Sequence, residues 1–413
     1  MKEIVIQQQQ HKLRAALLEN DTLIEVFEEE EDNPGRLVGN IYRGRVENVL
    51  PGMQAAFVDI GLEKNAFLYV MDALPAKFSE DENKAETPEK VRVEQVLKPR
   101  QELLVQIIKE PVGTKGARVT TNITLPGRYC VLMPQVDYVG ISRKISDLEE
   151  RERLRDLALK VRKEPMGVIV RTLAKGLEEE ELAEDLKNLY SVWSEIQKKV
   201  SKTAVPGLVY QDVDLITRLV RDFIDQDIEK ITVDQEEIAQ VLRSSLQALG
   251  HKAARHISVR SRDLFVEKGI DDEIRKALRP KVWLKSGGYL VINQTEALVV
   301  IDVNTGKYVG ENSLEETVVY TNLEAAREIA RQLRLRNLGG IIIIDFIDMV
   351  SDEARQTVIE ELTRVCAQDK TVSHVLGLTK LGLVEMTRKK NGQMLMARYT
   401  KPCDHCEGAG RIY

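Results

Sequence analysis

The sequence predicts a multidomain protein in which a small β-barrel is combined with α/β layers. From Gly39, the segment GNIYRGRVENVLPGMQAAFVDIGLEKNAFLYV consists of short apolar runs broken by turn residues, which is typical of a small closed barrel. From Pro280, strand patterns alternate with a long helical pattern, which indicates an α/β layer with a largely parallel sheet. A chain of 413 residues has room for roughly two to four such domains.

The N-terminal region of the chain is dominated by strand patterns. Residues 1–37 predict an opening strand or two followed by an acidic turn. Residues 72–95 are polar and contain proline, so we expect a long loop there. The segment LKPRQELLVQIIKEP at 97–111 returns as a strand, which predicts that the barrel carries one loop insertion.

The middle of the chain is less regular. Residues 118–175 mix short strands with turns and one charged helix, at roughly 146–163. A mainly helical stretch follows, from about 178 to 279, without a clear internal boundary. The strand–helix alternation that predicts the α/β layer begins only after this stretch.

Composition and charge indicate a globular cytoplasmic protein. Hydrophobic residues make up 43% of the chain, but no apolar stretch is long enough to cross a bilayer, and the N-terminus does not resemble a signal peptide. The four cysteines, Cys130, Cys366, Cys403 and Cys406, are too few and too unevenly spaced for a disulfide framework. The net charge of −6 argues mildly against a nucleic-acid partner, but the acidic residues are clumped, which leaves other faces free to be basic.

Two apolar strands end on aspartates. LVVIDVN at 298–304 and IIIIDFID at 341–348 each place a carboxylate at the tip of an aliphatic run, where it is costly unless it is paired or bound to a metal. The segment between them predicts one helix, which begins with a capping box of Ser313 and Glu316 and ends at the glycine pair 339–340. A right-handed crossover would leave both strand tips on the same edge of the sheet.

Asp302 and Asp345 are therefore candidate metal ligands. Neighbouring carboxylates repel one another, and a hard dication such as Mg²⁺, which prefers oxygen ligands, relieves that repulsion. Asn304 lies two residues past Asp302 and shares its side-chain direction in an extended segment, so it is placed to support a carboxylate. The alternative is that either aspartate caps a turn or the following helix, which is the commoner role of an aspartate at a strand end.

The segment GVIVRT at 167–172 suggests a phosphate contact. It ends in Arg171 and Thr172, and a guanidinium fork beside a hydroxyl suits a terminal phosphate, whose two negative charges distinguish it from an internal phosphodiester. The alternative is that the pair binds nothing, as is true of most Arg-Thr pairs on protein surfaces.

The segment CDHCEGAG at 403–410 is a CxxCxGxG knuckle, whose glycines let the loop turn back so that backbone amides face the sulfurs. A CxxC pair also fits a redox site. The trailing glycines and the absence of a thioredoxin-like context favour zinc, with Cys403 and Cys406 as ligands.

Longer stretches of the chain resemble a known family. EALVVIDVNTG, TNLEAAREIARQLRLRNLGGIIIIDFIDM and GLVEMTRKK closely resemble the catalytic region of bacterial ribonuclease E/G. The likeness also covers the barrel, the segment GTKGARVTT and the terminal CxxC, so it spans essentially the whole chain. It implies a Mg²⁺-dependent endoribonuclease that cuts single-stranded A/U-rich RNA, prefers a 5′-monophosphate, leaves 5′-phosphate and 3′-hydroxyl ends, and acts in RNA processing, rRNA processing and mRNA decay.

The resemblance further implies a layout in which an RNase H-like fold is split by inserted domains. The implied order is a first RNase H-like segment at 1–37, an OB-fold RNA-binding barrel at 38–120, a 5′-sensor at 121–216, a second RNase H-like segment at 217–281, a DNase I-like catalytic domain at 282–400 and a zinc link at 401–413.

Site residues follow from the same resemblance. They are Asp302 and Asp345 as the metal-binding catalytic aspartates, Asn304 as the asparagine that supports them, Arg171 and Thr172 as the 5′-phosphate sensor, and Gly127 and Val131 as its supporting contacts.

In the barrel, Phe57 and Phe67 match family aromatics that stack on bases, and Lys115 matches a lysine that meets the RNA backbone. Stacking on aromatic rings requires no sequence readout, which suits an enzyme with relaxed specificity. The alternative is that both phenylalanines belong to the barrel core.

The knuckle also bears on assembly. A structural zinc takes four ligands and the knuckle offers two, with His405 and His374 as the nearest internal candidates by type. A second copy of the knuckle would complete the site, so we expect a homodimer joined by one shared zinc, as the resemblance also implies, and no tetramer. The family usually has proline where this chain has Asp404, which should loosen the knuckle slightly.

Two rival functions remain. The chain would be a non-catalytic RNA-binding scaffold if the α/β layer served only dimerisation, but the retention of Asp302, Asn304 and Asp345 argues against this. A different metal-dependent phosphodiesterase is a further alternative, and the barrel with its aromatics argues against a small-molecule substrate.

Overall fold

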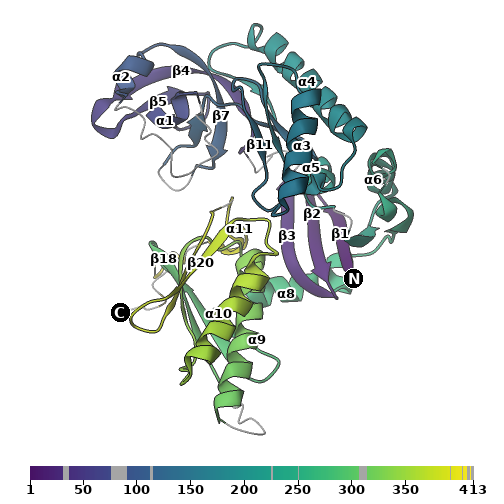
Figure 1. The fold of residues 1–413 in the computed structure, drawn as a ribbon, viewed down its shortest axis with the longest axis vertical. Coiled ribbons are helices and arrows are strands. Elements are labelled where there is room, and N and C mark those ends of the chain that lie inside the picture. The colour runs from purple at the N-terminus through teal and green to yellow at the C-terminus, as the bar shows by residue number, and fades with distance from the viewer. Residues whose placement is uncertain are drawn as a thin grey trace. The chain divides into compact units, whose positions relative to one another are not determined.

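Figure 1 shows the computed structural model of the protein. It describes residues 1–30, 37–75, 91–111, 115–224, 227–249, 251–306, 314–390, 392–401, 403–406 and 410, and every structural statement below concerns these residues. The chain forms two compact units. Met1–Asp32 and Gln226–Tyr413 form the first unit, and Asn33–Asp225 form the second.

The first unit contains a five-stranded sheet built from the two ends of its discontinuous sequence. The strand order is β15 (Ile257–Val259), β14 (Ile228–Val233), β1 (Lys2–Gln9), β2 (Lys12–Glu19) and β3 (Thr22–Glu30). β1, β2 and β3 form an antiparallel meander, and β1 pairs in parallel with β14. The opening segment thus supplies three strands where the sequence predicted one or two.

Helices accompany this sheet in the stretch after β14. They are α6 (Glu236–Ala248), η4 (Lys252–His256), α7 (Leu264–Glu267) and α8 (Ile270–Ala277). The prediction of a mainly helical stretch over 178–279 was therefore incomplete, because it missed β13 (Gly207–Tyr210), β14 and β15. These strands are short, and they are stabilised by partners far away in the sequence, which a local pattern does not reveal.

The first unit also contains a six-stranded sheet, which carries the two predicted aspartates. Its strand order is β16 (Lys281–Trp283), β17 (Tyr289–Gln294), β18 (Leu298–Asn304), β19 (Gly340–Asp345), β21 (Val384–Arg388) and β20 (Ser373–Leu378). Only β18 and β19 are paired in parallel, so the prediction of a largely parallel sheet was wrong. Short connections join β16 to β17, β17 to β18 and β20 to β21, which makes these pairs antiparallel. β21 reaches β19 after the hairpin with β20 and also pairs antiparallel.

Two long helices pack on one face of this sheet. α9 (Leu314–Leu335) and α10 (Asp352–Cys366) lie side by side in Figure 1. Alternate residues of β18 and β19 are buried in the core that these helices share, including Ile301, Ile342 and Ile344. The residues between them, Asp302 among others, therefore lie on the opposite face, which we call the open face.

The predicted start of α9 cannot be compared with the structure, and its predicted end differs from the observed one. Ser313 of the expected capping box lies outside the described residues. At the other end the helix stops at Leu335, earlier than the predicted glycine pair, and Asn337 adopts a left-handed conformation with φ of 49°. Its side chain donates to the Gln393 carbonyl at 3.1 Å, so an asparagine rather than a glycine ends this helix.

The second unit contains the predicted barrel. Five strands close on one another because β4 pairs with both β5 and β7; the strands are β4 (Ile41–Leu50), β5 (Ala55–Asp59), β6 (Ala66–Tyr69), β7 (Glu102–Lys109) and β8 (Arg118–Thr120). β13 adds to β4 as a sixth strand. The predicted loop at 72–95 is bounded by the short helices α1 (Val70–Ala73) and α2 (Val93–Val96), and its residues 76–90 lie outside the described ranges.

The rest of the second unit is a four-stranded sheet packed against helices. The strand order is β11 (Val139–Ile141), β12 (Gly167–Val170), β10 (Cys130–Met133) and β9 (Leu125–Pro126), and the helices are α3 (Leu148–Val161), α4 (Glu179–Val200) and α5 (Leu215–Asp222). α3 matches the predicted charged helix. Trp193 of α4 is buried in this core.

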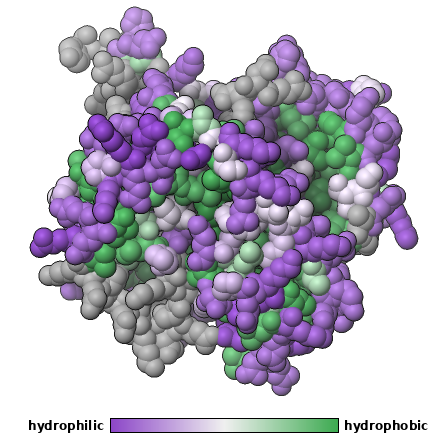
Figure 2. All heavy atoms as spheres, turned by 90° about the horizontal axis from the view of Figure 1, so that it is seen from above, coloured by the Kyte–Doolittle hydropathy of each residue, from purple (hydrophilic) through white to green (hydrophobic). Residues whose placement is uncertain are grey.

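On the face seen in Figure 2, apolar side chains gather in separate patches among hydrophilic ones. Several of the large exposed apolar side chains of the whole chain belong to the six-stranded sheet, including Trp283, Ile341 and Leu376. No helix within the described ranges has the length and apolar character needed to span a bilayer.

Candidate metal centre and substrate-binding residues

The pairing of β18 with β19 brings the two predicted aspartates together. In the parallel register, Asp302 lies opposite Asp345. Neighbouring strands are about 4.8 Å apart, and paired residues point to the same face, so both carboxylates lie on the open face at one edge of the helix-covered layer. This is the juxtaposition that a crossover between two strand tips predicts.

Both aspartates are exposed, so the cost of burying a charge does not arise at this site. The Asn304 side chain donates from Nδ2 to Asp302 Oδ2 at 2.8 Å, which fixes the orientation of that carboxylate and leaves its other oxygen available. Two like charges side by side on one face still repel each other, and a divalent cation would relieve that repulsion.

The donor set fits a hard divalent cation. It consists of carboxylate oxygens on an accessible sheet face, and Mg²⁺ usually keeps several waters and takes only one or two carboxylates from a protein. Within the ranges that the structure describes, no group of three or more His, Cys, Asp or Glu side chains converges as a closed metal cage. The two aspartates thus suit an open Mg²⁺ site better than a closed structural one.

A buried amide positions the segment that follows Asp345. Asn322 of α9 is fully buried, donates from Nδ2 to the Ile347 carbonyl at 2.8 Å and accepts from the Ile347 amide at 3.1 Å. Both backbone groups of Ile347 are thus held by one side chain, two residues past Asp345. Sequence reasoning missed Asn322; an asparagine within a helix of strong apolar periodicity was the available signal.

A glycine turn packs closely against the end of β18. A Cβ atom on Gly306, whose φ is +62°, would lie 2.4 Å from the Gly287 carbonyl oxygen, and one on Gly288 would lie 2.8 Å from the Asn304 carbonyl oxygen. Glu324 of α9 accepts hydrogen bonds from the backbone of the same turn, at Lys285 N and Ser286 N. The turn therefore requires glycine, and it restrains the strand end that carries Asn304.

In the second unit, the predicted sensor residues lie together. Arg171 donates from one terminal nitrogen to the Gly127 carbonyl at 2.5 Å, and its other terminal nitrogen pairs with Asp222 at 2.8 Å. The Thr172 hydroxyl lies 2.9 Å from the hydroxyl of Ser142. Asp222 and Ser142 are partners that sequence reasoning missed, because they come from segments far from GVIVRT.

The charge of Asp222 is stabilised despite its partial burial. Burial alone would raise the pKa of this carboxyl, but hydrogen bonds and positive charge from Arg221 and Arg171 lower it below its usual value. The Arg171 guanidinium is therefore held by a carboxylate on one side and a carbonyl on the other. This arrangement fixes the direction of its remaining donors.

One carboxylate binds the backbone at the start of the strand that contains Val131. Asp185 of α4 accepts hydrogen bonds from three consecutive backbone amides, at 3.1 Å from Arg128, 2.8 Å from Tyr129 and 3.1 Å from Cys130. A Cβ atom on Gly127 would lie 2.6 Å from an Asp185 oxygen, so a side chain there would displace the carboxylate from its amide partners. Val131 is the next residue after Cys130 and lies within β10. It pairs with Ile169 of β12, the strand that leads into Arg171.

The barrel aromatics are not fully buried in the barrel core. Phe57 and Phe67 face each other across β5 and β6 with ring centroids 6.1 Å apart, and both are partly exposed. Lys115 is exposed and lies just before Ala117, whose carbonyl accepts from the Phe67 amide at 2.7 Å. Because both rings are partly exposed, they are available for contact with a ligand. Phenylalanines that belonged fully to the barrel core would not be.

The cysteines fall into two kinds. Cys130 and Cys366 are buried, and burial raises the pKa of both thiols, that of Cys366 to about 12. Cys403 is exposed, and backbone hydrogen bonds from His405 and Cys406 lower the pKa of its thiol. These hydrogen bonds thus favour the thiolate of Cys403, the form that binds metals.

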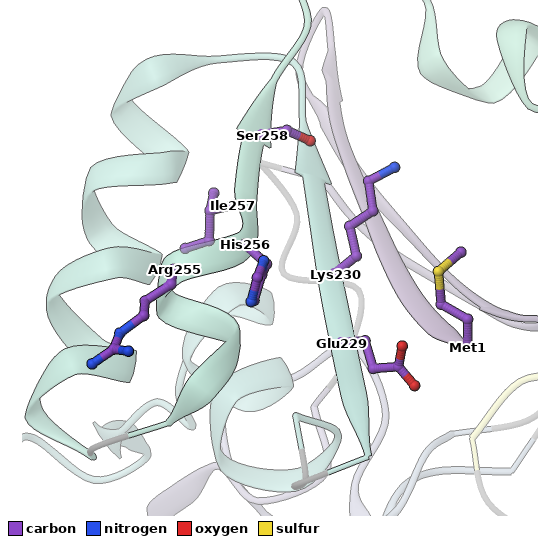
Figure 3. Close-up of a pocket in the computed structure, with 7 residues that line it drawn as sticks. All are labelled: Met1, Glu229, Lys230, Arg255, His256, Ile257 and Ser258. Atoms are coloured by element: carbon purple, nitrogen blue, oxygen red, sulfur yellow. The ribbon is translucent and has the colours of Figure 1, made fainter.

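A pocket of about 580 Å³ lies elsewhere on the first unit and contains none of the predicted site residues. Glu229 and Lys230 of β14 line one side of it, and Arg255 to Ser258 of η4 and β15 line the other, with Met1 nearby (Figure 3). Lys230 forms an ion pair with Glu3 of β1 at 3.4 Å, so its positive charge is partly neutralised within the sheet.

Comparison with known proteins assigns the family. The protein-family model described as "Ribonuclease E/G family" matches residues 124–391 of this chain. The chain belongs to the ribonuclease E/G family.

Similar proteins include both branches of this family. The chain is 42% identical to "Ribonuclease G" of Haemophilus influenzae over 414 residues, which cover 99% of this chain and 84% of the relative. It is 42% identical to "Ribonuclease G" of Escherichia coli over 421 residues, with the same coverage. It is 44% identical to "Ribonuclease E" of a Nostoc species over 379 residues, which cover 90% of this chain but 54% of the relative.

The double contact of Asn322 with Ile347 generates a prediction about order in the site. Asn322→Ala should destabilise the fold by about 1–3 kcal/mol, because it removes two hydrogen bonds and leaves backbone groups of Ile347 unpaired. Amide exchange in residues 341–348 should accelerate more than elsewhere, as measured by mass spectrometry. The matched control is Gln356→Ala, which removes an exposed amide from α10. Uniform acceleration across the first unit would contradict a local positioning role.

Proposed function

We propose that the protein is a Mg²⁺-dependent endoribonuclease of RNA processing and mRNA decay that cuts single-stranded A/U-rich RNA and prefers 5′-monophosphorylated substrates. The observation that carries the proposal is the parallel register that places Asp302 beside Asp345 on an open sheet face. Membership of the ribonuclease E/G family supports an endoribonuclease. The products would carry 5′-phosphate and 3′-hydroxyl ends.

Asp302 and Asp345 would hold the metal. When bound there, Mg²⁺ would supply Lewis-acid activation of water and stabilise the charge that develops on the phosphodiester. Asn304 keeps one oxygen of Asp302 occupied, so that the other points to the ligand side. Asn322 and the glycine turn restrain the two strand ends, which keeps the carboxylates preorganised.

Arg171 and Thr172 would recognise the 5′ end of the RNA. The remaining donors of the Arg171 guanidinium and the Thr172 hydroxyl are suited to a terminal phosphate, which carries more charge and more free oxygens than an internal diester. Gly127 supports the site by accepting from Arg171 and by leaving room for Asp185. Val131 lies on the neighbouring strand, where its backbone supports the same site.

Phe57, Phe67 and Lys115 would hold the single strand. Partly exposed aromatic rings stack on bases at about 1–3 kcal/mol per base without reading sequence, and an exposed lysine attracts the phosphates. Contacts of this kind leave the sequence preference weak.

Cys403 and Cys406 would bind zinc shared between two chains. The hydrogen bonds that favour the Cys403 thiolate support a metal ligand. Two thiolates per chain fill half of a tetrahedral site, so a second chain would complete it in a homodimer.

The scaffold alternative, in which the α/β layer has no catalytic role, predicts that Asp302 and Asp345 are dispensable for the function of the protein.

The aspartate pair provides the direct test of the proposed activity. Asp302→Asn and Asp345→Asn should each lower cleavage of an A/U-rich oligonucleotide by orders of magnitude while RNA affinity stays nearly unchanged, because the interaction lost belongs to the transition state. Asp352→Asn, which alters an exposed carboxylate on α10, should leave the rate unchanged. Near-normal cleavage by either site variant would support the scaffold alternative.

The sensor is tested by comparing substrate ends. Arg171→Ala should slow cleavage of 5′-monophosphorylated RNA about tenfold or more and barely affect the same RNA with a 5′-hydroxyl, because a charge-assisted phosphate contact is lost. Arg171→Lys keeps the charge but not the fork, so it should restore the preference only in part. An equal loss on both substrates would assign Arg171 to folding or general binding.

Metal analysis with light scattering tests the shared zinc. The wild-type protein should contain one zinc per two chains and have the mass of a dimer, and the double variant Cys403→Ser, Cys406→Ser should lose both properties. Cys366→Ala, which removes a buried thiol, should retain the zinc. One zinc per chain, or a dimer that survives loss of both thiols, would rule out this arrangement.

A further inference from the structure

We infer that Trp283, Tyr289 and Lys281 form a stacking subsite for a base of the RNA substrate, on the same sheet face as Asp302. The inference rests on the proposed function, since it deepens the description of how that substrate is held. We call these three residues the stacking platform.

Strand register places the stacking platform on the open face. Trp283 pairs with Tyr289, and Tyr289 pairs in turn with Asn304, so these three residues form one row across β16, β17 and β18. The neighbouring row runs from Lys281 through Val291 and Asp302 to Asp345. Paired residues of adjacent strands share a face, so the platform and the aspartates point to the same side of the sheet.

The burial pattern supports the same assignment. Leu290 and Leu284 are buried in the core beneath α9 and α10, and Val282 packs against that core. The residues that alternate with them are Lys281, Trp283 and Tyr289, and Trp283 is 64% exposed. A large aromatic ring on this face therefore contributes little to the core of the sheet.

The platform is held in one arrangement by its own contacts. The rings of Trp283 and Tyr289 meet edge to face, with centroids 5.4 Å apart and planes inclined by 63°. Lys281 Nζ lies 4.1 Å from the Trp283 ring centroid and 3.5 Å from that of Tyr289. The ammonium thus fixes two rings in one arrangement by cation–π contact.

Its chemistry complements single-stranded RNA. An exposed indole accepts any base by stacking on the face that Lys281 does not cover, and the lysine attracts the phosphates that flank that base. An aromatic pair that holds a cation between its rings suits a polyanion with flat bases better than a cationic or aliphatic ligand.

The distance to the aspartates fits a substrate that extends along the sheet. β16 lies two strands from β18, so the platform lies about 10 Å from Asp302. A strand that keeps the stacked spacing of a duplex, about 3.4 Å per nucleotide, covers this distance in about three nucleotides. The base on the platform would therefore lie a few nucleotides from the cleaved bond.

Tryptophan fluorescence tests the platform directly, because the chain has two tryptophans and Trp193 is buried. The protein, in the non-cleaving Asp302→Asn background, is titrated with an A/U-rich oligonucleotide. We expect quenching that disappears in Trp283→Phe, together with retained affinity in that variant because a phenyl ring still stacks. Trp283→Ala should weaken binding about tenfold.

A second set of oligonucleotides locates the base. Each contains one abasic residue, moved along the RNA, and quenching should fall at one position within about three nucleotides of the cleavage site. In the active protein, Trp283→Ala should raise KM about tenfold and leave kcat nearly unchanged. Leu376→Ala, which removes an exposed side chain from the opposite edge of the sheet, should change neither.

The outcomes separate this inference from the proposed function. Cleavage by Asp302→Asn would refute the metal site. The titration would then use an oligonucleotide with a non-cleavable backbone, so that quenching still reports on the platform. Absence of quenching, or unchanged KM in Trp283→Ala, would overturn the platform. A change of oligomeric state in Trp283→Ala with unchanged RNA affinity would also overturn it, and would show instead that this face contacts a second protein chain.

Discussion

The parallel pairing of β18 with β19 is the constraint on which the candidate site depends. Ile301, Ile342 and Ile344 are buried against α9 and α10, and these residues fix which alternate positions face the helices. A shift of one residue in either strand would send its aspartate into the apolar core, and in β18 it would also expose Ile301. The register that keeps both aspartates out of the apolar core is thus the register that places two carboxylates side by side in solvent.

Buried or half-buried polar side chains hold the backbone next to the candidate site residues in both units. Asn322 binds both backbone groups of Ile347 in the first unit, and Asp185 binds three amides beside Gly127 in the second. Arg388 is almost fully buried and donates to Asp369 at 2.8 Å and to the Leu338 carbonyl at 2.7 Å, just before β19 begins. Each of these groups is costly to bury without its partners, so each favours one local backbone geometry.

Local patterns in the sequence predicted the elements of the fold that depend on near neighbours. They indicated the strands that end at Asp302 and Asp345, the helix between them and the closed barrel. They failed where pairing is long-range: β14 is stabilised by β1, and four of the five strand pairings in the six-stranded sheet are antiparallel, contrary to prediction. Periodicity identifies which face of a strand is apolar, but not which strand lies beside it.

The same limit applies to the candidate site. Asp302, Asn304 and Asp345 stood out because they interrupt or follow aliphatic runs. Asp222 and Ser142 did not, because their proximity to Arg171 and Thr172 is produced by folding of the whole second unit. Trp283 looked like an ordinary strand residue, since the sequence does not reveal that β16 is an edge strand with one face left open.

A double-mutant cycle on divalent-cation binding tests the shared metal site most directly. Titration calorimetry with Mg²⁺ would compare the wild-type protein with Asp302→Asn, Asp345→Asn and the double variant. If the two carboxylates bind one ion together, either single substitution should abolish most of the binding and the double variant should lose little more. Additive losses, or full binding in either single variant, would contradict a shared metal site.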